Sequence, residues 1–172
     1  MQDTKAGFVT YFDADLMFYN NPESLFEFGN NVNVLIQPNN FSANEIHQYP
    51  DVGYYCAGWD SFRNNTEGKK VVEWWHKRCV EWCCAKFEEG KFGGQKYLDD
   101  WKSKFKGVRE ITDVGASIAP WNVNKYDLSL NNDQVYINEK WPLIYYHFHS
   151  FRMNLSNYKY VITGDRHNDY SI

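Results

Sequence analysis

The sequence predicts an α/β fold, in which strands alternate with a small number of helices. Three observations lead to this expectation. Residues 8–18 form an apolar run broken only by two carboxylates, residues 64–90 carry apolar side chains at helical spacing, and short aromatic and β-branched runs between turn residues fill much of the remainder. With 172 residues, the chain has the length of one domain of ordinary size.

The first element is a predicted buried strand that ends on Asp13 and Asp15. Open α/β folds bind ligands at the carboxyl ends of their strands, so this position would set two oxygen ligands at the rim of a sheet. An ordinary surface turn is the alternative reading, because Asp-x-Asp also occurs by chance. The apolar flanks on both sides favour a site, since an isolated buried carboxylate is costly.

A short helix and a second strand should follow. Asn21 suits an N-cap and Pro22 suits the first helical position, which predicts a helix from Pro22 to Phe28. Val32 to Ile36 reads as a strand that ends at the turn residues 37–40.

The longest predicted helix begins at Asn64 or Thr66 and ends at Gly90. Its apolar face contains Val71, Trp75, Cys79, Trp82, Cys83 and Phe87. A second helix is predicted from Gln95 to Phe105, after a tight turn at residues 93–95 whose backbone amides could face a ligand.

The four cysteines admit two readings. Cys79, Cys83 and Cys84 fall within one helical stretch, and Cys56 stands alone. Their spacing along the helix is typical of small buried side chains, so we expect them to pack in the core. A structural zinc site or a disulfide is the alternative, although zinc would need further ligands from elsewhere in the chain.

The second half of the chain is predicted to be rich in strands. Strands are expected at residues 58–63, 108–111 and 142–148, with a hairpin whose turn lies at residues 131–133. His147 and His149 lie at the end of the last strand and would point the same way on it. They could be hydrogen-bonded core residues, or they could be metal ligands beside the Asp-x-Asp.

Composition excludes several partners. The net charge is −4 and the pI is near 5.7, without a long basic cluster, so neither nucleic acid nor an anionic membrane surface is expected to bind. The sequence contains no apolar run of transmembrane length and no signal sequence, which predicts a cytoplasmic protein without a membrane span.

Aromatic residues make up 19% of the chain, and tryptophan and tyrosine rings can stack on sugars. Trp75 and Trp82 lie on the predicted helix face and are expected in the core. Trp121, between Pro120 and Asn122 in an irregular loop, is the strongest candidate for a sugar platform. Trp59, Trp101 and Trp141 could also line an acceptor groove, although packing in the core is the more common role for any one of these side chains.

Five motifs in order resemble those of a bacterial group of GT-A glycosyltransferases related to glycosyltransferase family 8. They are YFDADLMF at residues 11–18, GWDSFRN at 58–64, KFGGQKYLDDW at 91–101, APWN at 119–122 and HFHSFR at 147–152. The resemblance implies that residues 1–152 form the C-terminal portion of a GT-A domain, a mixed sheet with flanking helices, and that residues 153–172 are a C-terminal tail.

The resemblance also implies a site and an activity. A divalent metal, Mn²⁺ or Mg²⁺, would be bound by Asp13, Asp15 and His147, with His149 as the other possible register, and would bridge the diphosphate of a nucleotide sugar. Gln95 would lie near the transferred sugar as a catalytic and donor-binding residue, and Trp121 would contribute to donor binding. The implied reaction is sugar transfer from the nucleotide-diphosphate sugar to an unknown glycan, lipid or protein acceptor.

The chain departs from the family pattern at several positions. Gly94 stands where the family has Asp, Cys56 where it often has Asn, and Asn39 where His would be expected. Only twelve residues precede Asp13, which suggests a fragment of a longer protein or a degenerate one, with an exposed sheet edge that favours association. A non-catalytic carbohydrate- or protein-binding remnant is therefore the alternative function. A phosphoryl hydrolase with Asp13 as nucleophile is a third reading, which lacks a supporting Lys or Ser/Thr motif.

Overall fold

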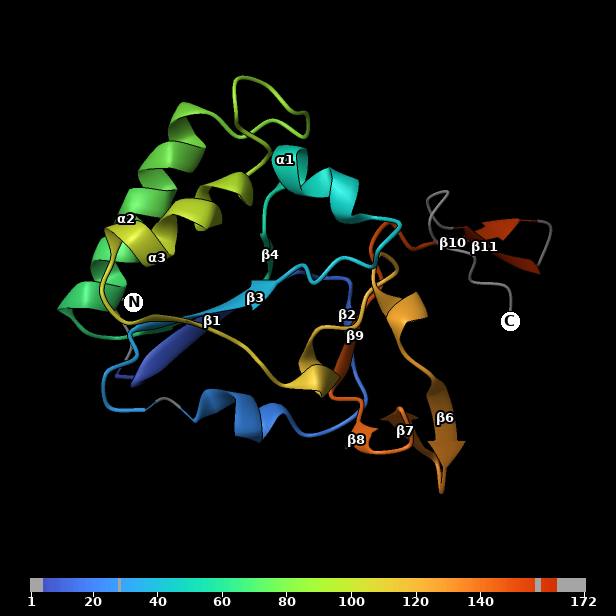
Figure 1. Cartoon of the computed structure of the whole chain (residues 1–172). Helices are drawn as coiled ribbons and strands as arrows, with labels where there is room; N and C mark the ends of the chain where they lie inside the picture. Colours follow the sequence, from blue (N-terminus) through green and yellow to red (C-terminus); the bar gives the residue numbers. More distant parts are fainter. Residues whose placement is uncertain (1–4, 28, 157–158, 164–172) are drawn as a thin grey trace.

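The computed structural model describes residues 5–27, 29–156 and 159–163, and it has the predicted mixed α/β architecture. Its main sheet has four strands in the order β1-β4-β3-β5 (Figure 1). The central strand β4 pairs antiparallel with β1 and β3, and β3 pairs parallel with β5, so the sheet is mixed. These strands are β1 (Phe8–Phe12), β3 (Val34–Pro38), β4 (Tyr55–Arg63) and β5 (Val108–Glu110).

Helices cover one face of this sheet, and a short 3-10 helix lies against the other (Figure 1). The helices on the first face are α2 (Thr66–Glu81), the 3-10 helix Lys96–Asp100 and α3 (Trp101–Lys104). The opposite face carries the 3-10 helix Pro22–Phe26, which begins as predicted with Asn21 as its N-cap. Side chains of successive residues in β3 point to opposite faces of the sheet. Val34 and Ile36 pack on the face covered by α2, whereas Leu35 packs with Trp59 on the opposite face.

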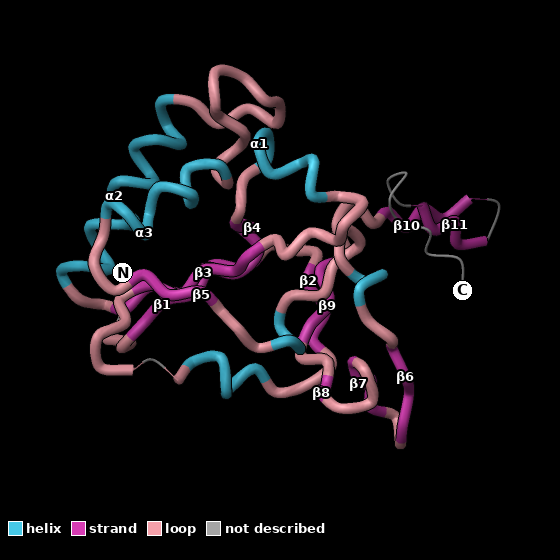
Figure 2. The backbone as a smooth tube through the Cα atoms, viewed as in Figure 1, coloured by secondary structure: helices cyan, strands magenta, loops and turns pink. Residues whose placement is uncertain are grey.

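Three small sheets complete the described chain (Figure 2). Strand β2 (Leu16–Phe18) pairs with β9 (Tyr145–His147), β6 (Leu128–Asn131) pairs with β7 (Gln134–Ile137) and then β8 (Trp141–Pro142), and β10 (Arg152–Ser156) pairs with β11 (Lys159–Thr163). The remaining short helices are Ile46–Gln48, α1 (Tyr49–Val52), Val114–Ala116 and Val123–Lys125.

The strand predicted to end on Asp13 and Asp15 is present as β1, which ends at Phe12, but the prediction that it is buried is wrong. A turn at residues 13–15 separates β1 from β2, an additional strand that joins a different sheet. Strand β1 is an edge strand of the main sheet, and its residues are partly or fully exposed. The apolar run therefore marks an exposed edge rather than a strand covered on both faces.

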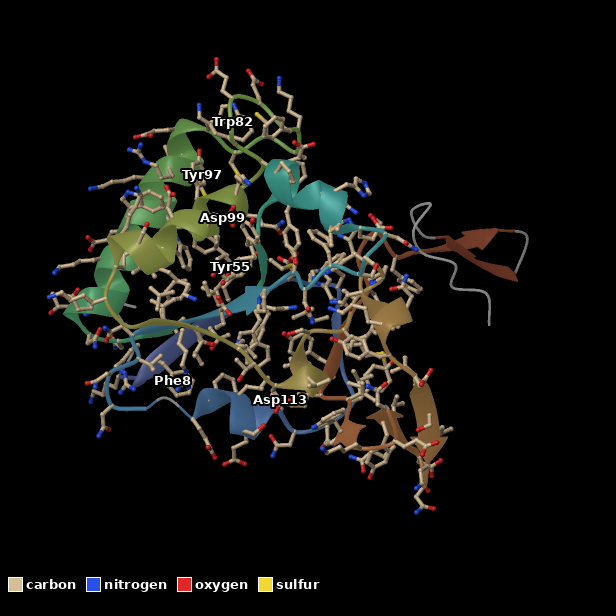
Figure 3. The ribbon with its side chains drawn as sticks, viewed as in Figure 1. Phe8, Tyr55, Trp82, Tyr97, Asp99 and Asp113 are labelled. Atoms are coloured by element: carbon tan, nitrogen blue, oxygen red, sulfur yellow. The ribbon has the colours of Figure 1, made fainter. Side chains whose placement is uncertain are left out.

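The predicted helix at residues 64–90 is shorter than expected. Its N-cap is Asn65, whose side chain accepts a hydrogen bond from the backbone N–H of Gly68. The helix ends at Glu81 because Trp82 adopts an extended backbone conformation (Figure 3). The following residues form a loop that returns toward the helix, with the N–H of Gly93 donating to the carbonyl of Cys84.

This early helix end changes the expected positions of the cysteines. Cys56 is buried and Cys79 is half-buried, but Cys83 and Cys84 are exposed on the loop, so the core-packing prediction is wrong for the last two. All four are free thiols, and within the described residues none belongs to a cluster suited to a metal ion.

Several of the later elements are confirmed. The helical segment predicted from residue 95 is present as a 3-10 turn followed by α3, and the hairpin turns at Asn132 and Asp133, both in the left-handed region. The strand predicted at residues 142–148 is divided into β8 and β9, because Leu143 donates a hydrogen bond to Val135 whereas Ile144 donates to Gly115.

Two of the tryptophans considered for an acceptor groove have the other role considered for them, packing in the core. Trp59 and Trp101 are fully buried. The half-buried Trp75 packs against the core between α2 and the sheet, and its indole N–H donates to the carbonyl of Gly94 at 2.8 Å. Within the described chain, no helix has the length and apolar character needed to cross a membrane.

Trp101→Ala should lower the free energy of unfolding by about 3 to 5 kcal/mol, because the indole is 0% exposed and its removal leaves a cavity beneath α2. Urea unfolding followed by circular dichroism would measure this change. Val80→Ala, on the exposed side of α2, is the control and should change stability by less than about 0.5 kcal/mol. Equal effects of the two substitutions would contradict this account of the core.

Candidate metal and ligand site

Two strand pairings bring Asp13, Asp15 and His147 together. Asp13 directly follows β1, and its backbone N–H donates to the carbonyl of Gly58 in β4 at 3.1 Å. Asp15 directly precedes β2, and its carbonyl accepts a hydrogen bond from the N–H of Phe148 at 2.8 Å. His147 is the last residue of β9, whose pairing with β2 places it opposite Leu16.

The imidazole of His147 faces both carboxylates. Its Nε2 lies 3.1 Å from Oδ1 of Asp15 and 3.7 Å from Oδ2 of Asp13. The neighbouring imidazole lowers the pKa of Asp15. His147 is only 2% exposed, yet within the described residues its Nε2 has no partner that meets hydrogen-bond geometry. The approach to Asp15 is therefore a close contact of two ligand atoms rather than an aligned hydrogen bond.

The other side of the His147 ring packs on β4. Its Nδ1 lies 3.7 Å from the sulfur of Cys56, a buried thiol whose pKa is raised by burial, so that it stays protonated. A Cβ atom at Gly58 would lie 2.9 Å from the same nitrogen. The absence of a side chain at Gly58 therefore allows the imidazole to lie against the strand, with Nε2 directed toward the carboxylates.

His149 provides a second imidazole at the same place. Asp15, His147 and His149 each offer a ligand atom, and these atoms lie within 4.8 Å of one another. His149 is exposed whereas His147 is buried, and the two ring centroids are 6.1 Å apart. The predicted ligands Asp13, Asp15 and His147 are thus neighbours, and the alternative register, His149, is also within reach of Asp15.

These residues fit a divalent metal ion. Carboxylate oxygens are the ligands that Mn²⁺ and Mg²⁺ prefer, and imidazole nitrogen is compatible with Mn²⁺ and with later transition metals. The buried Nε2 of His147, which lacks an aligned hydrogen bond, is directed toward two carboxylates. A metal ion would use that nitrogen and would offset the repulsion between Asp13 and Asp15.

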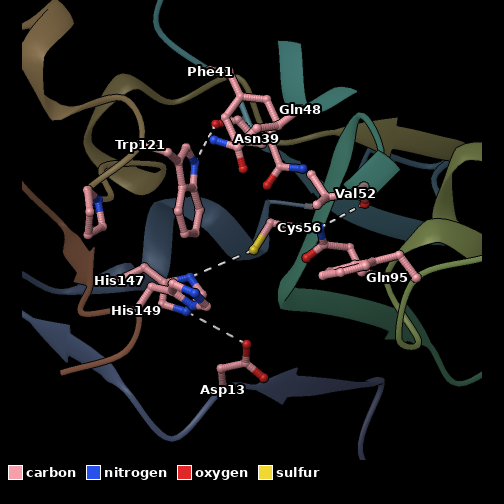
Figure 4. A pocket seen from close by; sticks show the side chains of 12 residues that line it. Asp13, Asn39, Phe41, Gln48, Val52, Cys56, Gln95, Trp121, His147 and His149 are labelled. Carbon is pink, nitrogen blue, oxygen red and sulfur yellow. Dashed lines mark hydrogen bonds and ion pairs between the residues drawn. The ribbon is translucent and has the colours of Figure 1, made fainter. Parts of the chain in front are cut away.

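A cavity of about 310 Å³ opens beside the carboxylates (Figure 4). It combines aromatic and aliphatic side chains with a few amide and imidazole groups, which is the usual composition of a site for a small polar ligand. Its lining residues are Asp13, Asn39, Phe41, Gln48, Val52, Cys56, Phe92, Gln95, Pro120, Trp121, His147 and His149.

Trp121 forms one wall of this cavity. Its indole N–H donates to the carbonyl of Asn39 at 2.8 Å, and its ring centroid lies 5.3 Å from that of His147. The fully buried Asn122 fixes this loop, since its amide donates to the carbonyls of Asn39 and Ser117. These hydrogen bonds place the indole at the edge of the carboxylate site.

Gln95 lines the opposite side of the cavity, across Cys56 from Trp121 (Figure 4). Its side-chain nitrogen donates to the carbonyl of Val52 at 3.0 Å, and its side-chain oxygen accepts a long hydrogen bond of 3.4 Å from the N–H of Ala57. The nitrogen and the oxygen of the Gln95 side-chain amide are thus both hydrogen-bonded, and these bonds connect the loop at residues 93–95 to α1 and β4.

The sequence did not assign a site role to several wall residues, and it noted Asn39 only as a departure from the family pattern. Asn39 directly follows β3, and its buried amide donates to the carbonyls of Gly53 and Tyr55. Its place at the carboxyl end of a strand was the available signal. The other unassigned wall residues, whose apolar or amide side chains gave no such signal, are Phe41, Gln48, Val52, Phe92 and Pro120.

Asp60 is a further acidic residue that the sequence did not single out. It lies in the middle of β4 opposite Tyr11, is 0% exposed, and neither carboxylate oxygen has a hydrogen-bond partner within the described residues. Burial first, and then the negative charge of Asp13, raise its pKa well above the usual value for Asp. The folded protein therefore favours the neutral acid at this position.

Comparison with curated proteins identifies two relatives in Bacillus subtilis (strain 168). The chain is 35% identical over 151 residues to the uncharacterized protein YfnF, covering 84% of this chain and 50% of YfnF. It is 29% identical over 150 residues to the uncharacterized protein YfnD, covering 86% of this chain and 48% of YfnD. The chain thus spans about half the length of the curated relatives it matches. No protein-family model and no solved structure matches it.

Asp60 should make the metal-free protein less stable as the pH rises. In the unfolded chain this carboxyl ionises near pH 4, whereas its raised pKa in the folded state keeps it protonated. The free energy of unfolding therefore falls as the pH rises through the interval between the two pKa values. Asp60→Asn removes this dependence. Urea unfolding in EDTA at pH 5 and pH 8 should therefore show a larger gain in stability from Asp60→Asn at pH 8. A gain that is equal at both values, or larger at pH 5, would contradict a neutral buried acid.

Proposed function

We propose that this chain carries the metal and donor site of a glycosyltransferase with a GT-A fold, which transfers a sugar from a nucleotide-diphosphate sugar to a glycan, lipid or protein acceptor. The observation that carries the proposal is the position of His147. Its buried Nε2 lies within 4 Å of oxygens from both aspartates of the Asp-x-Asp, at the edge of a cavity with an aromatic wall. The five ordered sequence motifs that include these residues lead to the same proposal.

Asp13, Asp15 and His147 would hold Mn²⁺ or Mg²⁺, and His149 could replace or join Asp13. When bound, the metal supplies positive charge that favours a diphosphate and its departure from the sugar. The chain's own contribution is to hold the ligands: Gly58 admits the imidazole, and the pairing of β2 with β9 keeps Asp15 beside it. These contacts fix the ligand atoms before any metal binds, which reduces the ordering cost of binding.

The cavity would receive the sugar of the donor or the acceptor. Trp121 presents an aromatic side chain held by the carbonyl of Asn39, and such rings bind the apolar faces of sugars. Gln95 lies across the cavity, where its amide joins Val52 to Ala57. We therefore assign Gln95 a positioning role for the cavity wall, in place of the catalytic role that the resemblance implies.

A binding protein without turnover is the second candidate, and one observation favours it. The amide of Gln95 is already engaged at both ends, and Gly94, the residue before it, has no side chain to offer a reacting sugar. Among the described residues, this side of the cavity therefore offers no charged group for catalysis. In a binding protein of this kind the metal site and the aromatic wall would retain the ligand without transferring a sugar.

Asp15→Asn should weaken Mn²⁺ binding at least tenfold, because it removes a charged ligand, and even outer-sphere partners of a metal contribute about 10- to 100-fold in affinity. Isothermal titration calorimetry of the metal-free protein with Mn²⁺, and separately with Mg²⁺, measures this affinity. His147→Ala should have a similar effect, and comparison with His149→Ala shows which imidazole is the ligand.

Asp133→Asn is the matched control for this titration. It changes a carboxylate to an amide in the exposed hairpin turn, where Asn also tolerates the left-handed backbone. Its isotherm should equal that of the wild type. An unchanged isotherm for Asp15→Asn would place the metal elsewhere.

The chain should release nucleoside diphosphate from UDP- or GDP-sugars far more slowly than about 1 s⁻¹, since Gln95 and Gly94 leave the reacting sugar poorly positioned. The assay combines a panel of these donors with Mn²⁺ and simple glycan acceptors. Glycosyl transfer predicts that the slow release requires metal and is lost in Asp15→Asn. Equal release by the wild type and Asp15→Asn would contradict transfer and favour the binding protein.

A further inference from the structure

The phenol of Tyr11 is hydrogen-bonded to the first carboxylate of the Asp-x-Asp. Its hydroxyl donates to Oδ1 of Asp13, with 2.7 Å between the two oxygens. An ionised carboxylate only accepts hydrogen bonds, so the phenol is the donor. Hydrogen bonds from a hydroxyl to a carboxylate are among the shorter and stronger ones in proteins. Tyr11 therefore restricts the orientation of the Asp13 side chain.

The two carboxylate oxygens of Asp13 have different neighbours. Oδ1 accepts the hydrogen bond from Tyr11, whereas Oδ2 lies 3.7 Å from Nε2 of His147, which Figure 4 marks by a dashed line. Oδ1 of Asp15 lies 3.1 Å from the same imidazole nitrogen. The oxygen of Asp13 that Tyr11 does not bind is thus the one beside the other candidate metal ligands.

The ring of Tyr11 is supported from α2. It makes an edge-to-face contact with Trp75, with 5.8 Å between ring centroids and 89° between ring planes. Trp75 is itself fixed on two sides, since it packs against the buried Trp101 and its indole N–H donates to the carbonyl of Gly94 at 2.8 Å. The helix and the loop beside the cavity therefore place the phenol that holds Asp13.

A similar hydrogen bond elsewhere in the chain shows what distinguishes Tyr11. The hydroxyl of Tyr136 donates to Oε1 of Gln134 at 2.8 Å, also across two positions of the sequence. Residues two apart on a strand point to the same face, so such bonds form readily. The acceptor of Tyr11 differs, because Asp13 is a charged side chain whose second oxygen faces His147.

We propose that Tyr11 is a positioning residue of the metal site, which holds Oδ1 of Asp13 so that Asp13 binds the metal through Oδ2 alone. This inference rests on the metal site of the proposed function, and it adds an outer partner and a binding mode for Asp13. Outer partners of metal ligands typically contribute about 10- to 100-fold in affinity. Tyr11 is 45% exposed, so water can replace its hydroxyl and we expect the lower end of this range.

Tyr11→Phe should weaken Mn²⁺ binding about tenfold in calorimetry, because it removes the hydroxyl and keeps the ring against Trp75. Tyr136→Phe is the matched control, since it removes the same kind of hydrogen bond in β7, and its isotherm should equal that of the wild type. If Tyr11→Phe binds Mn²⁺ as tightly as the wild type does, the role of Tyr11 is wrong and the metal site stands. A wild type that binds no Mn²⁺ would overturn both.

A double-mutant cycle with Asp13→Ala tests whether Tyr11 acts through Asp13, which a merely structural role would not require. Asp13→Ala retains Asp15 and His147 for a more weakly bound ion. In this background Tyr11→Phe should change the Mn²⁺ affinity by less than about twofold, because no carboxylate remains for the hydroxyl to hold. An equal loss in both backgrounds would contradict positioning through Asp13, as would an Asp13→Ala variant with wild-type affinity.

A crystal structure of the wild type with Mn²⁺ tests the binding mode of Asp13. Oδ2 should lie within coordination distance of the ion, and Oδ1 should keep its hydrogen bond to Tyr11. In the same crystals of Tyr11→Phe, the Asp13 carboxylate should turn from this orientation, since nothing holds Oδ1. Coordination of Mn²⁺ by both oxygens of Asp13 in the wild type, or an unchanged carboxylate in Tyr11→Phe, would overturn the proposal.

Discussion

The packing of His147 against β4 is the contact on which the rest of the candidate site depends. Gly58 leaves room for the imidazole, Cys56 lies against one ring nitrogen, and the other nitrogen faces Asp15 and Asp13. Each partner comes from a different segment, so the site exists only when β1 and β2 have paired with their partner strands. Trp121, whose ring lies against the same imidazole, adds the cavity wall to this arrangement.

Strand β4 has three roles, and the third of them lowers the stability of the fold. Its apolar residues Trp59 and Phe62 join the cores on the two faces of the sheet, and its glycine accommodates His147. The same strand buries Asp60 without a hydrogen-bond partner in the described residues, which costs free energy that a neutral side chain of similar size would not. Asp60 lies close enough to Asp13 for the charge of Asp13 to raise its pKa. Buried unsatisfied polar groups in native proteins often accompany functional sites.

The sequence was sufficient to predict most of the elements, because local signals define them: Pro22 after Asn21, the turn at Asn132 and Asp133, and the periodic start of α2. It misjudged the end of α2, because apolar residues continue at helical spacing into a loop whose conformation depends on tertiary contacts. The sequence and its resemblance were sufficient to predict that the Asp-x-Asp and His147 lie together. The buried state of Asp60 and the engagement of Gln95 could not, since both depend on which strands and loops surround them.

Anomalous X-ray diffraction from crystals soaked in Mn²⁺ provides the most direct test of the central claim, that one metal ion binds between the Asp-x-Asp and the end of β9. The account predicts an anomalous peak within coordination distance of Asp15 and His147, about 2.0 to 2.3 Å from the ligand atoms, with Asp13 or His149 as a further ligand. It also predicts loss of that peak in Asp15→Asn crystals. A peak only elsewhere on the protein, or a peak that persists unchanged in Asp15→Asn, would contradict it.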